Sequence, residues 1–102
     1  MITNEDFKNE VFRLAEEIEA KPKELHIRSM RTKWASCSNK GRITFSSSLL
    51  SETSEVRTKV ILHELLHLKY PNHGKMFKTL FASYLHKRGI DCSFEDYNLR
   101  VR

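Results

Sequence analysis

Apolar residues recur at helical spacing in three stretches of the chain. In the first stretch the apolar positions are Phe7, Val11, Leu14, Ala15 and Ile18. Their separation by three or four positions predicts a helix that begins near Thr3, a candidate N-cap, and ends before Pro22. The same spacing predicts two further helices, at about residues 54–70 and 74–88.

Two shorter segments alternate between apolar and polar residues, which is typical of strands. The segment ELHIRSM places Leu25 and Ile27 on one side. The segment RITFS does the same with Ile43 and Phe45, and SNKG just before it is a plausible turn. We therefore expect an α+β fold in which three helices pack on a small, mostly antiparallel sheet, in one domain covering residues 1–102.

The predicted helix at 54–70 is apolar on most of its circumference and carries two histidines, His63 and His67. At 100° per residue the two lie about 40° apart on one face. Unpaired imidazoles on a buried helix are unfavourable, and zinc would satisfy them because neutral imidazole nitrogens bind it well. The alternative is a pair of histidines hydrogen-bonded within the core.

Glu64 follows the first histidine directly and lies about 100° round the helix from it. It cannot easily share a metal with both His63 and His67, but it can reach a water held on that metal. This is the H-E-x-x-H arrangement of zinc peptidases, in which the histidines bind the metal and the glutamate is the base. We therefore expect one Zn²⁺ ion whose bound water is activated by Glu64.

His73 is the expected third ligand. It follows His67 at the spacing found in metzincins, although Tyr70 replaces their glycine and Pro71 and Asn72 supply the turn instead. When the apolar stripe of the following helix is extended back by one turn, His73 falls on the side that faces the helix carrying His63 and His67. Three histidines leave the fourth position of the zinc to water, as in catalytic sites.

Composition excludes several classes of protein. The chain is 39% apolar and 30% charged, as is usual for soluble globular proteins. Its acidic beginning does not read as a signal peptide, and no apolar run approaches the roughly 20 residues that span a bilayer. Two cysteines far apart, Cys37 and Cys92, read as reduced thiols. We expect a cytoplasmic protein with no membrane contact.

The net charge of +5 is unevenly distributed. Residues 1–20 hold six acids and two bases, whereas residues 21–42 hold seven bases and one acid, Glu24. A basic stretch of this kind is either a solvated hairpin or a surface that meets nucleic acid or an acidic partner. Charge alone does not decide between these interpretations.

Two blocks of sequence, RSMRTKWASCSNKGRITFSSSLL and VILHELLHLKYPNHGKMF, resemble the YgjP-like and SprT-like zinc metallopeptidases, and also the small minigluzincin scaffolds. The resemblance covers about residues 28–78. It implies that His63, His67 and His73 bind the zinc and that Glu64 is the general base. It also implies that residues 43–46 lie at the sheet edge above the cleft, where a substrate peptide could add as a strand.

The chain departs from the family pattern at a few positions outside the histidine motif. Ala35 stands where glycine is frequent, Ser46 where asparagine is usual, and Lys78 where tryptophan is common. These differences concern the substrate cleft. We interpret Trp34 and Cys37 as packing residues, and an inhibitory thiolate ligand is the alternative for Cys37.

The expected protein is thus a mini-zincin that acts as a zinc metalloendopeptidase on peptide or protein substrates. The alternative is a zinc-stabilised module that binds nucleic acid or protein within a larger complex, with residues 21–42 as its surface. The candidates for stabilising the oxyanion are Tyr70, Tyr84 and Tyr97. His26 and His86 are expected to be exposed.

Two questions concern the end of the chain. Gluzincins take their third ligand from a glutamate on a later helix, but no acid occurs between Gly74 and Gly89. The residues from 90 onward show no clear period. We hypothesise that they lie over the cleft and offer Glu95 or Asp96 to the zinc; packing on the sheet, or fraying, is the alternative.

Overall fold

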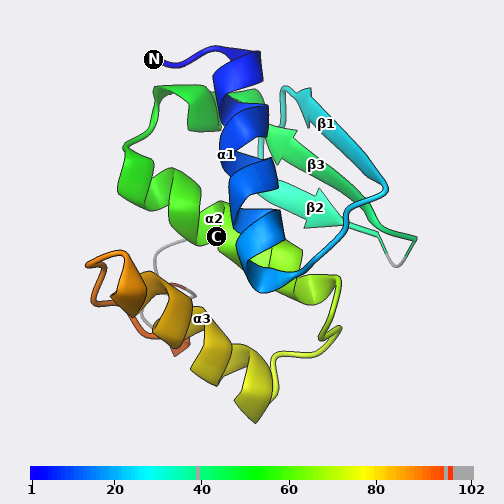
Figure 1. Ribbon diagram of the computed structural model, residues 1–102. Helices are drawn as coiled ribbons and strands as arrows, with labels where there is room; N and C mark the ends of the chain where they lie inside the picture. Colours follow the sequence, from blue (N-terminus) through cyan, green and yellow to red (C-terminus); the bar gives the residue numbers. More distant parts are fainter. Residues whose placement is uncertain (39, 96, 98–102) are drawn as a thin grey trace.

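The computed structural model describes residues 1–38, 40–95 and 97. Its elements in chain order are α1 (Asn4–Ile18), β1 (Glu24–Arg28), β2 (Ala35–Cys37), β3 (Arg42–Ser46), the 3₁₀ segment η1 (Ser47–Ser51), α2 (Ser54–His67) and α3 (Lys75–Lys87). α2 crosses behind α1, and α3 lies on the side of α2 away from the sheet (Figure 1). The predicted α+β class with three helices is confirmed.

Local sequence sets the ends of α1. The hydroxyl of Thr3 accepts a hydrogen bond of 3.0 Å from the backbone N–H of Asp6, which satisfies one of the free N–H groups of the first turn. At the other end Glu19 adopts a left-handed conformation (φ 58°), and its N–H bonds to the carbonyls of Ala15 and Glu16. The five apolar positions predicted for this helix are all buried.

The sheet has the strand order β1-β3-β2. β1 runs parallel to β3, with Leu25 beside Ile43, and β2 runs antiparallel to β3, with Ala35 beside Phe45. The sheet is therefore mixed and not mostly antiparallel as expected. In the connection from β2 to β3, the N–H of Gly41 donates a hydrogen bond of 3.1 Å to the carbonyl of Ser38. β1 and β3 are neighbours in the sheet but not in the sequence, because β2 lies between them along the chain.

β3 is the central strand, so the expectation that residues 43–46 form a sheet edge is wrong. Its burial agrees with this position, because Ile43 and Phe45 are fully buried. The edge strand that contacts α2 is β2. A three-residue strand is too short to show a period, and the sequence did not predict it.

α2 is the most enclosed element. It contacts α1, α3, β2 and η1, and its apolar side chains are almost completely buried: Val60, Ile61, Leu62, Leu65 and Leu66. The polar residues that lie among these apolar positions on α2 are therefore held in place by a tightly packed core. In the described part of the chain, no helix is long and apolar enough to cross a membrane.

Candidate metal centre

Three histidines converge at the C-terminal end of α2. His63 and His67 come from the helix itself, and His73 comes from the connection to α3. The Nε2 atom of His73 lies 3.1 Å from that of His63 and 2.8 Å from that of His67. The three imidazoles each offer a ligand nitrogen, and these atoms all lie within 4.8 Å of one another.

This spacing suits a single small cation. Nitrogens bound tetrahedrally to zinc at 2.0–2.1 Å lie about 3.3 Å apart, close to the separations found here. Three imidazoles are also a donor set that zinc accepts readily. The residues present therefore fit one zinc ion.

Glu64 orients the first imidazole of the cluster. Its Oε2 atom lies 2.7 Å from Nδ1 of His63, and both side chains are largely buried. Because the carboxylate can only accept, Nδ1 carries the proton and Nε2 presents its lone pair to the cluster. A carboxylate that holds a histidine in this tautomer is a common support for a metal ligand.

The electrostatic environment favours neutral imidazoles. Burial lowers the pKa of His67, and the neighbouring His63 adds to this effect, whereas Glu64 opposes it. Burial likewise lowers the pKa of His73, followed by the charges of His67 and His63. His73 is exposed as a residue, but its ring nitrogen faces the other two imidazoles. The neutral form is the one that binds a metal.

Aromatic rings enclose the cluster on the side of α3. The fully buried ring of Phe77 lies 4.9 Å from the ring of His67 and 4.8 Å from that of His73, measured between centroids. Phe77 belongs to the apolar stripe of the helix predicted at 74–88, but the sequence pattern gives no sign that its ring lies beside the imidazoles. Its contact with both rings restricts how they can turn.

The segment after α3 also reaches the histidines. The ring of Phe94 lies 4.7 Å from that of His73, and the ring of Tyr97 lies 5.1 Å from that of His63. Both residues are buried. Of the two acids considered as zinc ligands, Glu95 forms an ion pair of 3.2 Å with Lys78 and is not in the histidine cluster, and Asp96 lies outside the described residues.

Among the three tyrosines considered for the oxyanion, Tyr97 is the one whose ring contacts a histidine of the cluster. Burial raises its pKa, and the nearby Glu64 and Cys92 raise it further. The phenol is therefore protonated at neutral pH and can donate a hydrogen bond. Tyr84 instead lies under the ammonium group of Lys87.

The other side of the cluster opens into a groove of about 460 Å³ between α2 and the edge strand β2. Its lining includes Ala35, Ser36 and Cys37 of the strand, together with Glu64 and His67. The exposed backbone edge and the candidate catalytic carboxylate thus border one space.

Cys37 packs at this groove and is not among the converging metal-binding atoms of the described residues. Burial and the charge of Glu64 raise the pKa of its thiol to about 11, and its Sγ contacts the carbonyl of Ser38 at 3.6 Å. The interpretation of Cys37 as a packing residue therefore agrees with the structure. His26 and His86 are exposed, as predicted.

A small α+β fold with an H-E-x-x-H helix and a third histidine nearby is typical of compact zincin-type metallopeptidases. The family model of the YgjP-like metallopeptidase domain matches residues 2–88, and the chain belongs to this family. A search of curated proteins finds no match.

Two solved structures share the fold. The metallopeptidase zymogen jannalysin of Methanocaldococcus jannaschii superposes with a TM-score of 0.65 at 24% identity, covering 96% of this chain and 89% of that one. The metallopeptidase zymogen abylysin of Pyrococcus abyssi gives a TM-score of 0.63 at 19% identity, covering 83% of this chain and 97% of that one. Both likenesses support the mini-zincin fold that the sequence predicts.

Proposed function

We propose that this protein is a zinc metalloendopeptidase in which His63, His67 and His73 hold one zinc ion and Glu64 is the general base. The observation that carries the proposal is the convergence of three imidazole nitrogens beside a carboxylate that borders a groove. Membership of a metallopeptidase family supports the same conclusion.

The three imidazoles of His63, His67 and His73 would hold the zinc ion, which would supply a Lewis acid to acidify water and polarise the carbonyl of the scissile bond. Glu64 accepts the proton of the attacking water and returns it to the departing amine. Its Oε2 atom is bonded to His63, and the residue also lines the groove beside His67. This position lets one carboxylate both orient a ligand and reach a substrate.

The substrate is a peptide or protein segment in extended conformation. We propose that it pairs with the free edge of β2, because among the described residues this strand has a neighbour on one side only and it borders the groove. Main-chain pairing selects extended segments with little dependence on sequence.

Cys37 and Cys92 are both free thiols, which is consistent with work in a reducing compartment such as the cytoplasm.

We further propose that the segment around Phe94 and Tyr97 restricts access to the cluster from the side opposite β2. The rings of these two residues lie against His73 and His63. Jannalysin and abylysin are both described as zymogens, which supports a latent form for this chain as well.

The test of the proposed activity is Glu64→Gln, assayed on a fluorogenic peptide alongside elemental analysis for zinc. The amide oxygen of Gln can still accept from His63, so zinc should remain bound while kcat falls by at least about a hundredfold. Glu55→Gln on the same helix is the matched control and should keep full activity. Hydrolysis that survives in Glu64→Gln would sink the proposal, as would the absence of hydrolysis from the zinc-loaded protein both with and without residues 92–102.

A further inference from the structure

A second groove, also of about 460 Å³, adjoins the one beside β2. The two grooves share three lining residues, Ser38, His67 and Pro71. A ligand that lies along β2 and extends past His67 therefore comes to the border of this second space. Its lining includes four lysines, Lys21, Lys23, Lys40 and Lys69, and one acid, Glu19.

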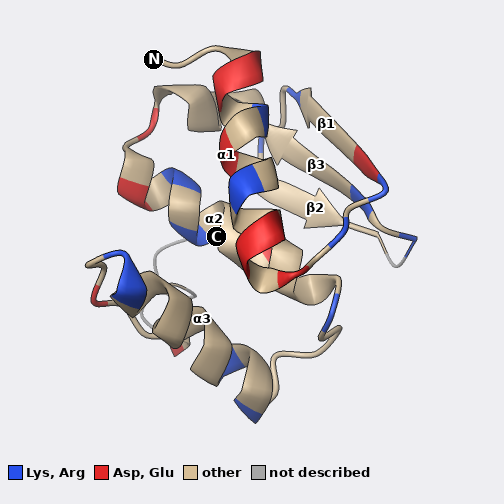
Figure 2. Ribbon diagram, in the orientation of Figure 1, with Lys and Arg blue, Asp and Glu red and all other residues tan. Residues whose placement is uncertain are grey.

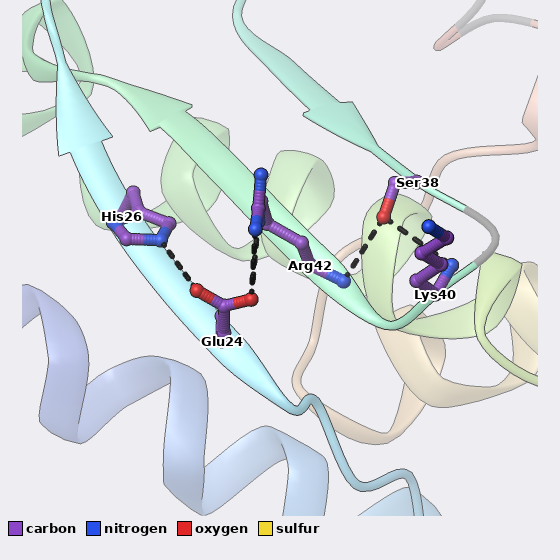
Figure 3. A network of polar contacts seen from close by, with 5 residues as sticks. All are labelled: Glu24, His26, Ser38, Lys40 and Arg42. Carbon is purple, nitrogen blue, oxygen red and sulfur yellow. Dashed lines mark hydrogen bonds and ion pairs between the residues drawn. The ribbon is translucent and has the colours of Figure 1, made fainter.

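Backbone hydrogen bonds bring these lysines together from separate segments. The N–H of Lys23 donates to the carbonyl of Gly41 at 2.8 Å, which ties the residues before β1 to the β2–β3 connection. The hydroxyl of Ser38 accepts from the backbone N–H of Lys40 at 3.3 Å and of Arg42 at 3.2 Å (Figure 3). Lys23 and Lys40 are thus placed by the fold at one end of the sheet.

Gly41 permits the close approach of the two segments. Its φ of +88° is rarely adopted by other residues, and a Cβ at this position would lie 3.1 Å from Cγ of Lys23. The stem of Lys23 therefore lies directly over the backbone of the connection. This packing restricts the base of the Lys23 side chain, and the residue lines the groove.

The basic residues of this region differ in whether their charge is already used. Arg42 is bound by Glu24 at 3.0 Å (Figure 3), and the ammonium group of Lys69 donates to the carbonyl of Ile18 at 3.1 Å. Within the described residues, Lys21, Lys23 and Lys40 make no ion pair. The second groove therefore keeps a positive charge that no carboxylate of those residues neutralises by direct pairing.

We propose that this lysine groove binds acidic side chains of the substrate and gives the peptidase a preference for acidic sequences on one side of the scissile bond. The inference rests on the proposed peptidase function. It follows from the shared wall at His67, because a peptide that pairs with β2 and crosses the cluster enters the field of Lys23 and Lys40. Opposite charges in a confined groove attract and orient a chain segment.

The arrangement favours an acidic peptide over nucleic acid. A phosphate backbone requires a basic stripe that continues along the surface. Here the stripe is interrupted, because Glu24 lies between His26 and Arg42 and binds both (Figure 3). Figure 2 shows the basic segments before β1 and at the β2–β3 connection gathered at one end of the sheet, with an acidic segment at the start of β1.

The test compares fluorogenic peptides in matched pairs. The two peptides of a pair differ only in carrying two Glu or two Gln residues, and different pairs carry these residues on one side or the other of the scissile bond. For the wild type we expect kcat/KM to be about tenfold higher for the Glu peptide at positions on one side only. Lys23→Gln/Lys40→Gln should reduce this ratio to about twofold, and Lys23→Glu/Lys40→Glu should invert it. Lys8→Gln/Lys87→Gln removes the same charge elsewhere on the surface and should leave the ratio unchanged.

Binding separates this inference from the proposed activity. Fluorescence anisotropy with the zinc-loaded Glu64→Gln protein should show the same preference for the labelled Glu peptide without any hydrolysis. If the preference is found in binding but no peptide is cleaved by the zinc-loaded protein, either with or without residues 92–102, the groove stands and the peptidase function fails. Equal ratios in the wild type and in both lysine variants would overturn the inference. So would tight binding of a short labelled DNA duplex that needs Lys23 and Lys40 in a protein with no peptide preference.

Discussion

The three histidines of the cluster are held in unequal ways. His63 and His67 lie on α2, whose apolar side chains are almost completely buried, so the fold itself fixes their separation. His73 lies on the connection between α2 and α3, exposes much of its surface, and is held by ring contacts with Phe77 and Phe94. The helix therefore provides two preformed nitrogens, and the third depends on local contacts and on the metal.

The largest expected effect is on zinc affinity. His67→Ala and His73→Ala should each weaken zinc binding by more than about a hundredfold. Changes in residues that only support the ligands weaken metal binding by up to about a hundredfold, and the loss of a ligand itself should cost more. The two variants should differ without metal: His67→Ala should lower the Tm because it leaves space beside α2, whereas His73→Ala should hardly change it. Competition with a fluorescent zinc chelator and thermal unfolding of the metal-free proteins measure the two effects.

Glu95→Ala is the control for this comparison. It should break an exposed ion pair with Lys78 and leave zinc affinity almost unchanged. If His73→Ala keeps full zinc occupancy while Glu95→Ala loses it, the third ligand is a carboxylate and our assignment of His73 is wrong.

Removal of the metal should affect the connection more than the helix. Because zinc binds the folded state, a chelator should lower the Tm by about 5–10 °C. Amide hydrogen exchange should accelerate most at residues 68–74, where the N–H of Tyr70 bonds to the carbonyl of Leu66. Exchange within 60–66 should change little. Equal acceleration in both segments would show that α2 does not hold its two histidines in place without the metal.

The segment after α3 provides the next test, since Phe94 contacts His73. Deletion of residues 92–102 should increase hydrolysis of short peptides by about threefold to tenfold if these residues restrict access to the cluster and Tyr97 is not the group that stabilises the oxyanion. Circular dichroism and the Tm must show that the truncated protein is folded, because Phe94 and Tyr97 are buried. Phe94→Leu, which keeps an apolar contact with Phe81, is a milder variant and should give a smaller increase. Unchanged hydrolysis in a folded truncation would show that these residues do not restrict access to the histidine cluster.

The features of the fold that could be predicted from the sequence are the local ones. The buried face of α1 and its cap at Thr3 follow from spacing and residue type, and the structure has both. The convergence of His73 with α2 also follows from a short turn. The strand pairing was less predictable, because it depends on how the chain crosses between β1 and β3.

The charge pattern shows the same limit. The basic character of residues 21–42 is visible in the sequence, but which charges remain available is not. Glu24 stands beside Arg42 only because β1 and β3 pair in parallel with this register. The contact of Phe94 with the imidazoles depends in the same way on tertiary packing, since the end of the chain has no period from which its path could be predicted.

The smallest expected effect is on the acid stability of the metal-free protein. The pKa values of His67 and His73 are lowered in the folded state, so the unfolded chain binds more protons once the pH falls below the ordinary imidazole value of about 6.5. The free energy of unfolding should therefore be highest above this pH and should decrease as the pH falls towards 5.5. Urea denaturation of the metal-free protein at pH 7.5 and 5.5 measures the difference. His73→Gln should reduce the decrease only in part, because the exposed His73 contributes less than His67 on the buried helix. If the wild type is equally stable at both pH values, the fold does not hold the imidazoles in the neutral form. The nitrogens of His63 and His67 on α2 would then not be preformed for metal binding.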